Sequence, residues 1–345
     1  MVASKDISEE EARWALGLIL AGEASHAQIA AFAVALSAKG ETAEEMTGFV
    51  KAMFDVAEPL HVDELLVDTC GTGGDGKGTA NISTMAAFVV AGAGVKVCKH
   101  GGRAASSSAG SADVLEALGV VIDLGPNGVS NCIKQAGIGF CFAPRFHPAM
   151  RHAAPVRKEL GIPTIFNYLG PLANPARLSH QVIGVNNPDM ADKMIRVLAA
   201  NGCERAMVVH GFDGLDEITT TTRTRIWELS TTAEGDKKVS SYELDTYDIG
   251  IPHNKLEDLR GGDVQTNARL LRSVLRGEQG PLRDIVVVNA AAALVVVGVA
   301  KDLVEGVALA EESIDSGKAE RTLERLVAVS NAQASVESQL ATSTR

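Results

Sequence analysis

The first 58 residues carry apolar side chains at helical spacing, in three stretches that each open with a capping box. The boxes are Ser8 with Glu11, Ser25 with Gln28, and Thr42 with Glu45. Gly22 and Gly40 follow the first two stretches, where glycine commonly ends a helix. Three short helices cannot bury a core by themselves. We therefore predict a small all-helical subdomain over residues 1–61 that packs against a larger unit.

From about residue 62 the pattern changes to short apolar runs that alternate with helical stretches. LLVD at 65–68, VKVCKH at 95–100 and VVID at 120–123 have the length and composition of strands, and residues 85–94 and 111–118 are helical in pattern. Such alternation is typical of a mostly parallel sheet with helices on its faces. In these sheets the ligand lies at the carboxyl ends of the strands.

Composition supports the same fold class. Hydrophobic residues make up 46% of the chain and aromatic residues only 4%. A core of Ala, Val, Leu and Ile suits helices packed on a parallel sheet better than an all-β sandwich. We predict an α/β domain over residues 62–345, with a mostly parallel central sheet flanked by helices.

The C-terminal part has four simpler patterns. Residues 219–250 read as a β-hairpin with a charged turn at 233–238. The Ala- and Val-rich run 285–298 belongs to the buried core, and residues 303–329 are amphipathic and helical. The last sixteen residues are polar, and we expect them to be disordered.

Charge and cysteine content narrow the class of protein. A net charge of −11 argues against a nucleic-acid surface. The five cysteines are odd in number and form no C-x-x-C pair, which predicts reduced thiols in small core sites. The N-terminus is too acidic for a signal peptide, and no apolar run reaches the roughly 18 residues of a membrane span. We expect a cytoplasmic protein without a membrane segment.

The most informative stretch is DTCGTGGDGKGTANIST at 68–84, where five glycines lie within eight residues between an apolar strand and a helical run. Glycine permits positive φ and close approach of the backbone, and free N–H groups at a helix start point toward an anion. A flexible surface turn is the alternative, but such a turn needs neither Asp75 nor the NIST segment. The candidate substrate-binding residues here are Gly71, Gly74, Asp75, Thr79, Asn81, Ser83 and Thr84.

Two standard phosphate loops do not fit this stretch. In the G-x-x-x-x-G-K-[ST] pattern, Gly78 stands where the magnesium-binding hydroxyl belongs. In the G-x-G-x-x-G pattern, Gly76 is followed by more polar loop and not by a helix. A nucleotide triphosphatase and a dinucleotide-binding enzyme are therefore not favoured.

A second glycine- and serine-rich loop, KHGGRAASSSAGSAD at 99–113, follows the next predicted strand. Its cations, bare backbone and hydroxyls predict another anion site, and an exposed basic turn is the alternative. The candidate substrate-binding residues are Lys99, His100, Gly101, Arg103, Ser106, Ser107 and Ser111.

Two further clusters carry charge. Arg157 lies in a basic stretch, and an arginine that binds a carboxylate in bidentate fashion is one use of it, with a charged helix face as the alternative. Asp216 and Glu217 follow an apolar strand. In a loop, these two carboxylates can converge on a hard cation such as Mg²⁺, although adjacent acidic residues are more often simply solvated.

These motifs together resemble the anthranilate phosphoribosyltransferases. The chain keeps D-x-x-G-T-G-G-D and N-I-S-T at 68–84, P-V-R ending at Arg157, F-N-x-L-G-P-L-x-N-P at 166–175 and D-G-x-D-E at 213–217. The resemblance covers nearly the whole chain from Ile7 to about Ala328. It implies transfer of the 5-phosphoribosyl group from phosphoribosyl pyrophosphate to the amine of anthranilate in tryptophan biosynthesis, which yields N-(5-phosphoribosyl)anthranilate and pyrophosphate.

The resemblance also implies roles for individual residues. Lys99 would act on the leaving oxygens and Arg157 would bind the carboxylate of the acceptor, and both are counted as catalytic. Two Mg²⁺ ions are implied, one held by Ser83 and Glu217 and the other by Asp216 and Glu217. The segment of roughly 168–185 would join the helical subdomain, and the protein would be a homodimer.

The sequence departs from the family pattern at Gly102, where the family has an asparagine that touches anthranilate. Weaker acceptor binding, altered acceptor choice and a bridging water are all open. Family members usually carry one more helix before the counterpart of Ile7, and its absence leaves open whether this chain keeps their usual dimer contact. Two other functions stay open: a pyrimidine nucleoside phosphorylase, which would not need Asp216 and Glu217, and a non-catalytic relative that binds nucleic acid.

Overall fold

The computed structural model describes residues 4–104 and 108–343. Its three N-terminal helices, α1 (Glu9–Ala21), α2 (His26–Lys39) and α3 (Ala43–Val56), begin at the predicted capping boxes, all three of which form. The first two end at Gly22 and Gly40, where φ is 77° and 86°. Glycine is favoured at both positions because L side chains rarely adopt a positive φ.

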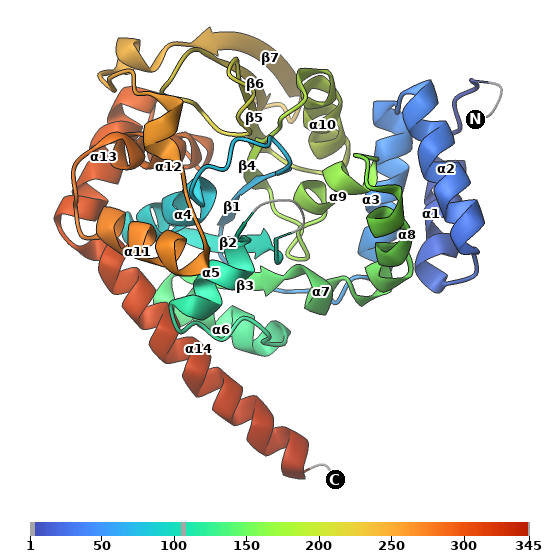
Figure 1. The fold of residues 1–345 in the computed structure, drawn as a ribbon, viewed down its shortest axis with the longest axis horizontal. Helices are drawn as coiled ribbons and strands as arrows, with labels where there is room; N and C mark the ends of the chain where they lie inside the picture. Colours follow the sequence, from blue (N-terminus) through green and yellow to red (C-terminus); the bar gives the residue numbers. More distant parts are fainter. Residues whose placement is uncertain (1–3, 105–107, 344–345) are drawn as a thin grey trace.

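The centre of the molecule is a seven-stranded sheet with the order β3-β2-β1-β4-β5-β6-β7 (Figure 1). Strands β3, β2, β1, β4 and β5 run parallel, and β6 and β7 form the antiparallel hairpin that the sequence predicts. The sheet is therefore mostly parallel, as predicted. The strands are β1 (Leu66–Gly71), β2 (Lys96–Gly101), β3 (Ile138–Phe142), β4 (His180–Gly184), β5 (Arg205–Gly211), β6 (Thr224–Thr231) and β7 (Lys237–Leu244).

Helices cover both faces of this sheet, and β5 shows the consequence for the sequence. Met207 and Val209 belong to one buried cluster, while Ala206 and Val208 belong to the other. Successive side chains of a strand point to opposite faces, so a strand that is covered on both sides is apolar at every position. The helices after the subdomain are α4 (Ile82–Gly92), α5 (Ser111–Ala117), α6 (Pro126–Ala136), α7 (Ala143–Phe146), α8 (Ala154–Leu160), α9 (Phe166–Leu172), α10 (Pro188–Ala200), α11 (Val264–Leu275), α12 (Pro281–Val296), α13 (Leu303–Asp315) and α14 (Lys318–Ser343), with short 3₁₀ turns at Pro148–His152, Thr246–Ile249 and Leu256–Leu259.

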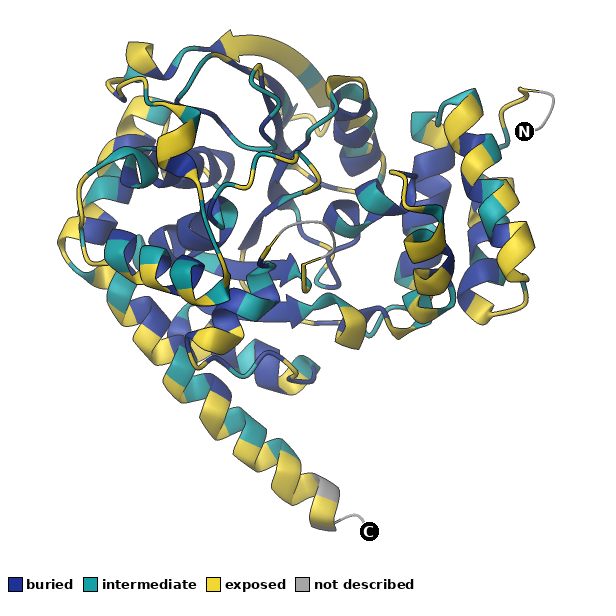
Figure 2. Cartoon of the chain, in the orientation of Figure 1, coloured by how far each residue is buried: buried dark blue, intermediate teal, exposed yellow. Residues whose placement is uncertain are grey.

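The two clusters divide the helices between the faces. The larger cluster packs α4, α6, α12, α13 and α14 against one face of the sheet. The smaller cluster joins α1, α2 and α3 to α8, α9, α10 and the opposite face. Figure 2 shows the parallel strands and α12 as mostly buried, whereas the edge strand β7 and the outer sides of α1 and α2 are exposed. The N-terminal helices therefore share a core with the second face of the sheet.

Two expectations about secondary structure are wrong. Residues 120–123 form no strand, because β3 already pairs with β2 along the edge of the sheet. Instead, the Val121 N–H donates to the Ser330 hydroxyl (3.1 Å). Residues 330–343 are not disordered but complete α14, and Glu337 accepts hydrogen bonds from the N–H of Gly125. Long-range contacts of this kind leave no pattern in the local sequence.

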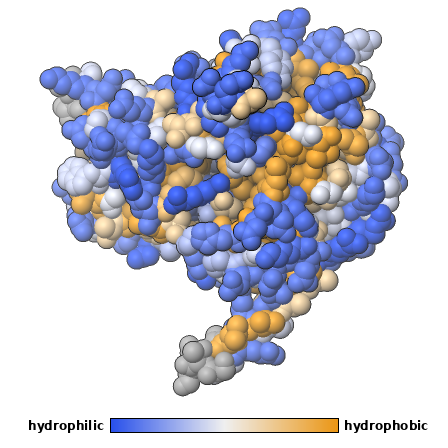
Figure 3. Space-filling model, turned by 180° about the vertical axis from the view of Figure 1, so that it is seen from behind, coloured by the Kyte–Doolittle hydropathy of each residue, from blue (hydrophilic) through white to orange (hydrophobic). Residues whose placement is uncertain are grey.

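The surface is mainly polar. Seen from the side opposite to Figure 1, hydrophilic residues cover most of the molecule, with an apolar area near the middle of the face (Figure 3). Apolar side chains occur again on the projecting end of α14, where Val336 and Leu340 are exposed. In the described part of the chain, no helix combines the length and the apolar character that crossing a bilayer requires. All five cysteines are buried free thiols, as predicted.

Candidate active site

A cavity of about 330 Å³ opens at the carboxyl ends of the central parallel strands. Its lining comes from the loops after β1, β2 and β5, from the first turns of α4 and α5, and from one residue each of α8 and α9. Ser106 and Ser107 lie outside the described residues. The other predicted site residues all line this cavity: Gly71, Gly74, Asp75, Thr79, Asn81, Ser83, Thr84, Lys99, His100, Gly101, Arg103, Ser111, Arg157, Asp216 and Glu217.

Two glycines bring the loop after β5 onto the strand ends. Gly71 and Gly184 are paired residues at the ends of β1 and β4. A Cβ at Gly71 would overlap the Asp216 carboxylate, and a Cβ at Gly184 would overlap the Asp216 carbonyl. In addition, the Gly73 N–H donates to Asp216 Oδ2 (2.7 Å). Bare backbone at both strand ends therefore allows the acidic loop to lie directly against the glycine loop.

Asp213, which was left without a predicted role, holds the acidic loop in place through hydrogen bonds within that loop. Its Oδ2 accepts hydrogen bonds from the hydroxyls of Thr219 (2.7 Å) and Thr221 (2.5 Å), and its Oδ1 accepts one from the N–H of Leu215 (3.1 Å). Asp213 does not line the cavity. Its contacts are those of a residue that holds the loop carrying Asp216 and Glu217.

The paired carboxylates are electrostatically crowded. Removal from bulk water, together with the nearby charge of Asp75, raises the pKa of Asp216 to about 6. Removal from water and the charge of Asp216 raise the pKa of Glu217 well above its ordinary value, although the Ser83 N–H donates to Glu217 Oε1 (3.2 Å). Partly buried carboxylates that repel one another fit a bound hard cation, because the cation relieves the repulsion.

The donor set suits an ion shared with a substrate. Within the described ranges, no three His, Cys, Asp or Glu side chains converge as a complete metal cluster. Mg²⁺ characteristically uses one or two carboxylates, several waters and the phosphates of the substrate. Asp216, Glu217 and the hydroxyl of Ser83 are residues of this kind, and they line the same cavity.

Lys99 lies among buried polar groups, including Asp68 and the Thr69 carbonyl, beneath the glycine loop. Its side chain is nearly inaccessible, and its ammonium donates to the Thr69 carbonyl (2.6 Å). Asp68 next to it is fully buried and accepts from the Asn174 amide (3.0 Å) and the His100 N–H (3.3 Å). Burial raises the pKa of the Asp68 carboxyl, and the Lys99 charge opposes this rise. The strand ends of β1 and β2 are thus fixed to each other by charge and hydrogen bonds.

Two buried imidazoles, those of His100 and His147, lie near Lys99. The His100 Nδ1 lies 3.1 Å from the Gly170 carbonyl, and the His147 Nε2 lies 2.8 Å from the Ala173 carbonyl. Burial lowers the pKa of His100 to about 3 and that of His147 to about 4. Both rings are therefore neutral near pH 7. His100 Nε2 is buried without a hydrogen-bond partner in the described part of the chain, and His100 lines the cavity.

The opposite wall of the cavity is more open. Arg157 on α8 is half-buried and forms no ion pair with any described carboxylate, and burial lowers its pKa. Asn167 on α9 also lines the cavity, and its Oδ1 accepts from the Thr164 N–H (3.1 Å). Sequence reasoning gave Asn167 no role, although it is the asparagine of the F-N-x-L-G-P motif. A partly desolvated guanidinium without a partner is suited to an anionic group of a ligand.

Arg103 and Gly102 also lie at the cavity, but Arg103 is already paired and Gly102 has no side chain. Arg103 lines the cavity, but its guanidinium already binds Asp113 (2.8 Å) and Glu116 (2.9 Å). Gly102 leaves free space, because the nearest heavy atom to an added Cβ is Ala143 Cβ at 4.0 Å. A Cβ at position 102 therefore meets no steric obstacle.

The second loop is tied to the glycine loop and to α11 by hydrogen bonds. The Asn81 amide donates to the Ala109 carbonyl (3.0 Å), and Asn81 Oδ1 accepts from Asn267 (2.9 Å). The Ser108 hydroxyl donates to the Gly262 carbonyl (2.6 Å). Asn267 escaped sequence reasoning because it is 186 residues from its partner along the chain. These contacts hold the two anion loops around one cavity.

Comparison with known proteins agrees with this geometry. Residues 1–57 match the helical bundle domain of the glycosyl transferase family, and residues 63–320 match its a/b domain. Anthranilate phosphoribosyltransferase from Thermomicrobium roseum is 51% identical over 98% of this chain and 97% of its own length. The corresponding protein from Salinispora arenicola is 52% identical over 96% of this chain and 95% of its own length.

Solved structures are similar over nearly the whole chain. Anthranilate phosphoribosyltransferase from Thermus thermophilus is 45% identical with a TM-score of 0.89, over 96% of this chain and 98% of its own. The enzyme from Saccharomyces cerevisiae in complex with PRPP and Mg is 29% identical with a TM-score of 0.86, over 94% of both chains. The chain therefore belongs to the anthranilate phosphoribosyltransferase family.

Proposed function

We propose that this chain transfers the 5-phosphoribosyl group from phosphoribosyl pyrophosphate to the amine of anthranilate, which releases pyrophosphate and serves tryptophan biosynthesis. The observation that carries this proposal is the convergence of two anion loops and a carboxylate pair on one cavity. A substrate with a monophosphate at one end and a metal-bound pyrophosphate at the other requires all three. The name shared by the relatives and the PRPP and Mg of the yeast structure support the same reaction.

The donor would bind along the glycine loop and the first turn of α4. Gly73 and Gly74 have positive φ, which opens the backbone to phosphate oxygens, and the hydroxyls of Ser83 and Thr84 lie at the helix start. Ser83 and Glu217 would hold one Mg²⁺ ion, and Asp216 and Glu217 a second. Bound Mg²⁺ neutralises the negative charge that develops on the pyrophosphate leaving group.

Lys99 supplies a fixed positive charge at the leaving oxygens. An ammonium has three N–H donors, and one of them is used by the Thr69 carbonyl. The other two remain for phosphate oxygens. Because Lys99 is held in place before substrate binds, its charge needs little reorganisation as the bond from C1′ to oxygen breaks.

Arg157 would bind the carboxylate of anthranilate and direct the amine toward C1′. Its lack of a carboxylate partner among the described residues leaves the guanidinium fork available. His100 Nε2 is available to a polar group of either substrate. An aromatic amine is already nucleophilic, so placement of the two substrates supplies most of the acceleration, and we assign no general base.

The decisive test is the fluorescence of anthranilate, followed with phosphoribosyl pyrophosphate and Mg²⁺. We expect consumption that stops when a chelator is added and resumes when Mg²⁺ is restored. A folded protein that leaves anthranilate unchanged would overturn the proposal. Phosphorolysis of a pyrimidine nucleoside that continues in the presence of the chelator would point to the phosphorylase.

The proposal includes a homodimer formed through the helical subdomain. Trp14 on α1 is 67% exposed, an unusual state for so large an apolar side chain. It lines a shallow groove of about 170 Å³ together with Leu18, Ala24 and Phe32. Light scattering of the native protein and of a Trp14→Lys variant tests this assembly: a dimeric mass that is kept by the variant excludes this face as the contact.

A further inference from the structure

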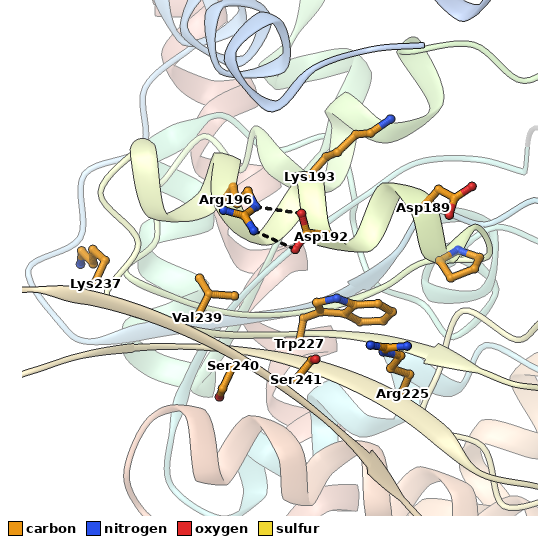
Figure 4. A pocket seen from close by; sticks show the side chains of 11 residues that line it. Asp189, Asp192, Lys193, Arg196, Arg225, Trp227, Lys237, Val239, Ser240 and Ser241 are labelled. Carbon is orange, nitrogen blue, oxygen red and sulfur yellow. Dashed lines mark hydrogen bonds and ion pairs between the residues drawn. The ribbon is translucent and has the colours of Figure 1, made fainter.

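A second cavity, of about 880 Å³, lies between α10 and the β6–β7 hairpin (Figure 4). Pro188 and four charged residues of α10 form one wall. The other wall is formed by Arg225 and Trp227 of β6 and by Lys237, Val239, Ser240 and Ser241 of β7. The two cavities share no lining residue.

The charge of this cavity differs from that of the whole protein. Four cationic side chains line it against two acidic ones, whereas the chain as a whole carries −11. Asp192 is already bound by Arg196 at 2.8 Å and 3.2 Å. Arg225 forms no ion pair with any carboxylate in the described residues; its guanidinium lies 5.2 Å from the centre of the Trp227 ring. This cation is thus oriented by an aromatic ring and is free to bind an anion.

Trp227 adds a donor and an apolar surface. The residue is 7% exposed. Its indole nitrogen is not among the described polar atoms that are buried without a partner, so the N–H is open to the cavity. Figure 4 shows the indole ring between α10 and the two strands, with its nitrogen edge turned toward α10. Here the open donor faces a cavity whose lining also includes Val239.

We propose that this cavity is a second binding site, specific for an aromatic carboxylate. The Arg225 guanidinium would bind the carboxylate, because its planar fork matches the two oxygens. The Trp227 N–H would donate to an acceptor on the ligand, and the ring of the ligand would pack against the edge of Trp227 and Val239. A simple inorganic anion would use the charge and the indole donor but not the apolar lining.

The chain offers a direct reporter, because it contains only two tryptophans. Replacing the exposed Trp14 (Trp14→Phe) leaves Trp227 as the only source of indole emission. Benzoate is the probe, titrated into this variant with cyclohexanecarboxylate and inorganic phosphate as comparisons. We expect a saturable change of Trp227 emission with benzoate at concentrations where the two comparison anions have no effect.

Arg225→Gln in the same background tests the assignment, and Arg223→Gln is its matched control. Arg223 lies two residues away but outside the cavity, near Glu243 and Asp245. We expect Arg225→Gln to weaken benzoate binding about tenfold or more and Arg223→Gln to leave it unchanged. Neither variant should alter phosphoribosyl transfer to anthranilate, so failure of this proposal is distinguishable from failure of the proposed function.

Saturation-transfer NMR of the benzoate ring protons repeats the comparison without relying on fluorescence. A signal that Arg225→Gln reduces and Arg223→Gln preserves supports the site. Equal signals from both variants, or no saturable binding by either method, would overturn it. Equal binding of cyclohexanecarboxylate would also overturn it, because the cavity would then not select an aromatic ring. Equal binding of phosphate would overturn it too, because the cavity would then not select a carboxylate.

Discussion

The two walls of the candidate active site are built on different principles. The donor wall, formed by Lys99, Asp216, Glu217 and the glycine loop, is crowded and internally bonded, and the pKa values of its carboxylates are strongly displaced. The acceptor wall, formed by Gly102, Arg157 and Asn167, is half-buried and has free space and a guanidinium without an ion pair among the described residues.

The difference follows from what each wall has to do. A leaving pyrophosphate carries several charges, and stabilising them requires fixed groups of opposite sign and a metal that is held before the reaction. A neutral amine with one carboxylate requires mainly placement. We therefore expect substitutions in the donor wall to abolish turnover, and substitutions in the acceptor wall to change affinity.

Glu217→Gln should have the largest effect. The substitution keeps the shape of the side chain but removes a charge that both proposed Mg²⁺ ions share, so we expect kcat to fall about 100-fold or more. Removing one of several repelling carboxylates should at the same time raise the melting temperature of the metal-free protein. Steady-state kinetics at several Mg²⁺ concentrations and metal-free thermal unfolding measure the two effects.

Glu204→Gln is the matched control for this prediction. Glu204 is an exposed carboxylate just before β5, outside the cavity. We expect neither its activity nor its metal-free melting temperature to change. If Glu217→Gln kept the native kcat, or if its metal-free stability dropped, the carboxylates of the donor wall would not act as repelling groups that bind Mg²⁺.

Gly184→Ala tests the steric part of the donor wall. An added Cβ would overlap the Asp216 carbonyl, so the acidic loop must move away from the strand ends. We expect activity to fall at least about tenfold, and the Mg²⁺ concentration needed for half-maximal activity to rise, since small displacements of positioned groups are costly. Gly17→Ala, a helical glycine with no heavy atom within 4 Å of the added Cβ, should leave both values unchanged.

The parts of the donor wall were largely predictable because each is a short contiguous motif, although the three motifs lie far apart along the chain. A glycine loop between a strand and a helix has one main use, and the residues at 68–84 and 99–113 all precede or open a helix at a strand end. The fold class followed from the alternation of strand and helix patterns, with support from composition. What binds the wall to the rest of the molecule was not predictable: Asn174 on Asp68 and Asn267 on Asn81 join positions that are 106 and 186 residues apart.

The same reasoning explains the errors at residues 120–123 and 330–343. An apolar tetrapeptide is compatible with a strand, but the sheet edge was already occupied by β3. A polar C-terminal segment reads as unstructured until the partners of Glu337 and Gln333, on and just before α6, are known. Local patterns predicted which elements form, whereas long-range hydrogen bonds decided where they end.

The histidines behind the two walls predict a loss of stability in acid. Burial lowers the pKa of His147 to about 4, below the value near 6.5 of an unfolded chain, so the unfolded state binds the proton first. Stability from this group is complete above about pH 6.5 and is lost as the pH falls toward 4, by on the order of 3 kcal/mol in total. Denaturant unfolding at a series of pH values measures this slope.

His147→Gln should flatten that slope, because the amide does not titrate and can still donate to the Ala173 carbonyl. His26→Gln, at an exposed position on α2, should leave the slope as it is in the native protein. Equal slopes for the native protein and His147→Gln would show that the buried imidazole does not govern acid stability.

Gly102→Asn should have the smallest effect, and that effect should fall on the acceptor alone. The added Cβ meets nothing closer than Ala143 Cβ at 4.0 Å, and the φ of Gly102 is not positive, so we expect the fold to tolerate the change. One new amide hydrogen bond to anthranilate would lower its KM about fivefold, with kcat and the KM of phosphoribosyl pyrophosphate unchanged.

Gly102→Ala separates the amide from the mere filling of space, and it should leave the KM of anthranilate near the native value. A large fall of kcat in Gly102→Asn would mean that position 102 also contacts the donor. The two walls would then act as one unit, and the distinction between a charged donor wall and a positioning acceptor wall would fail at the place where they meet.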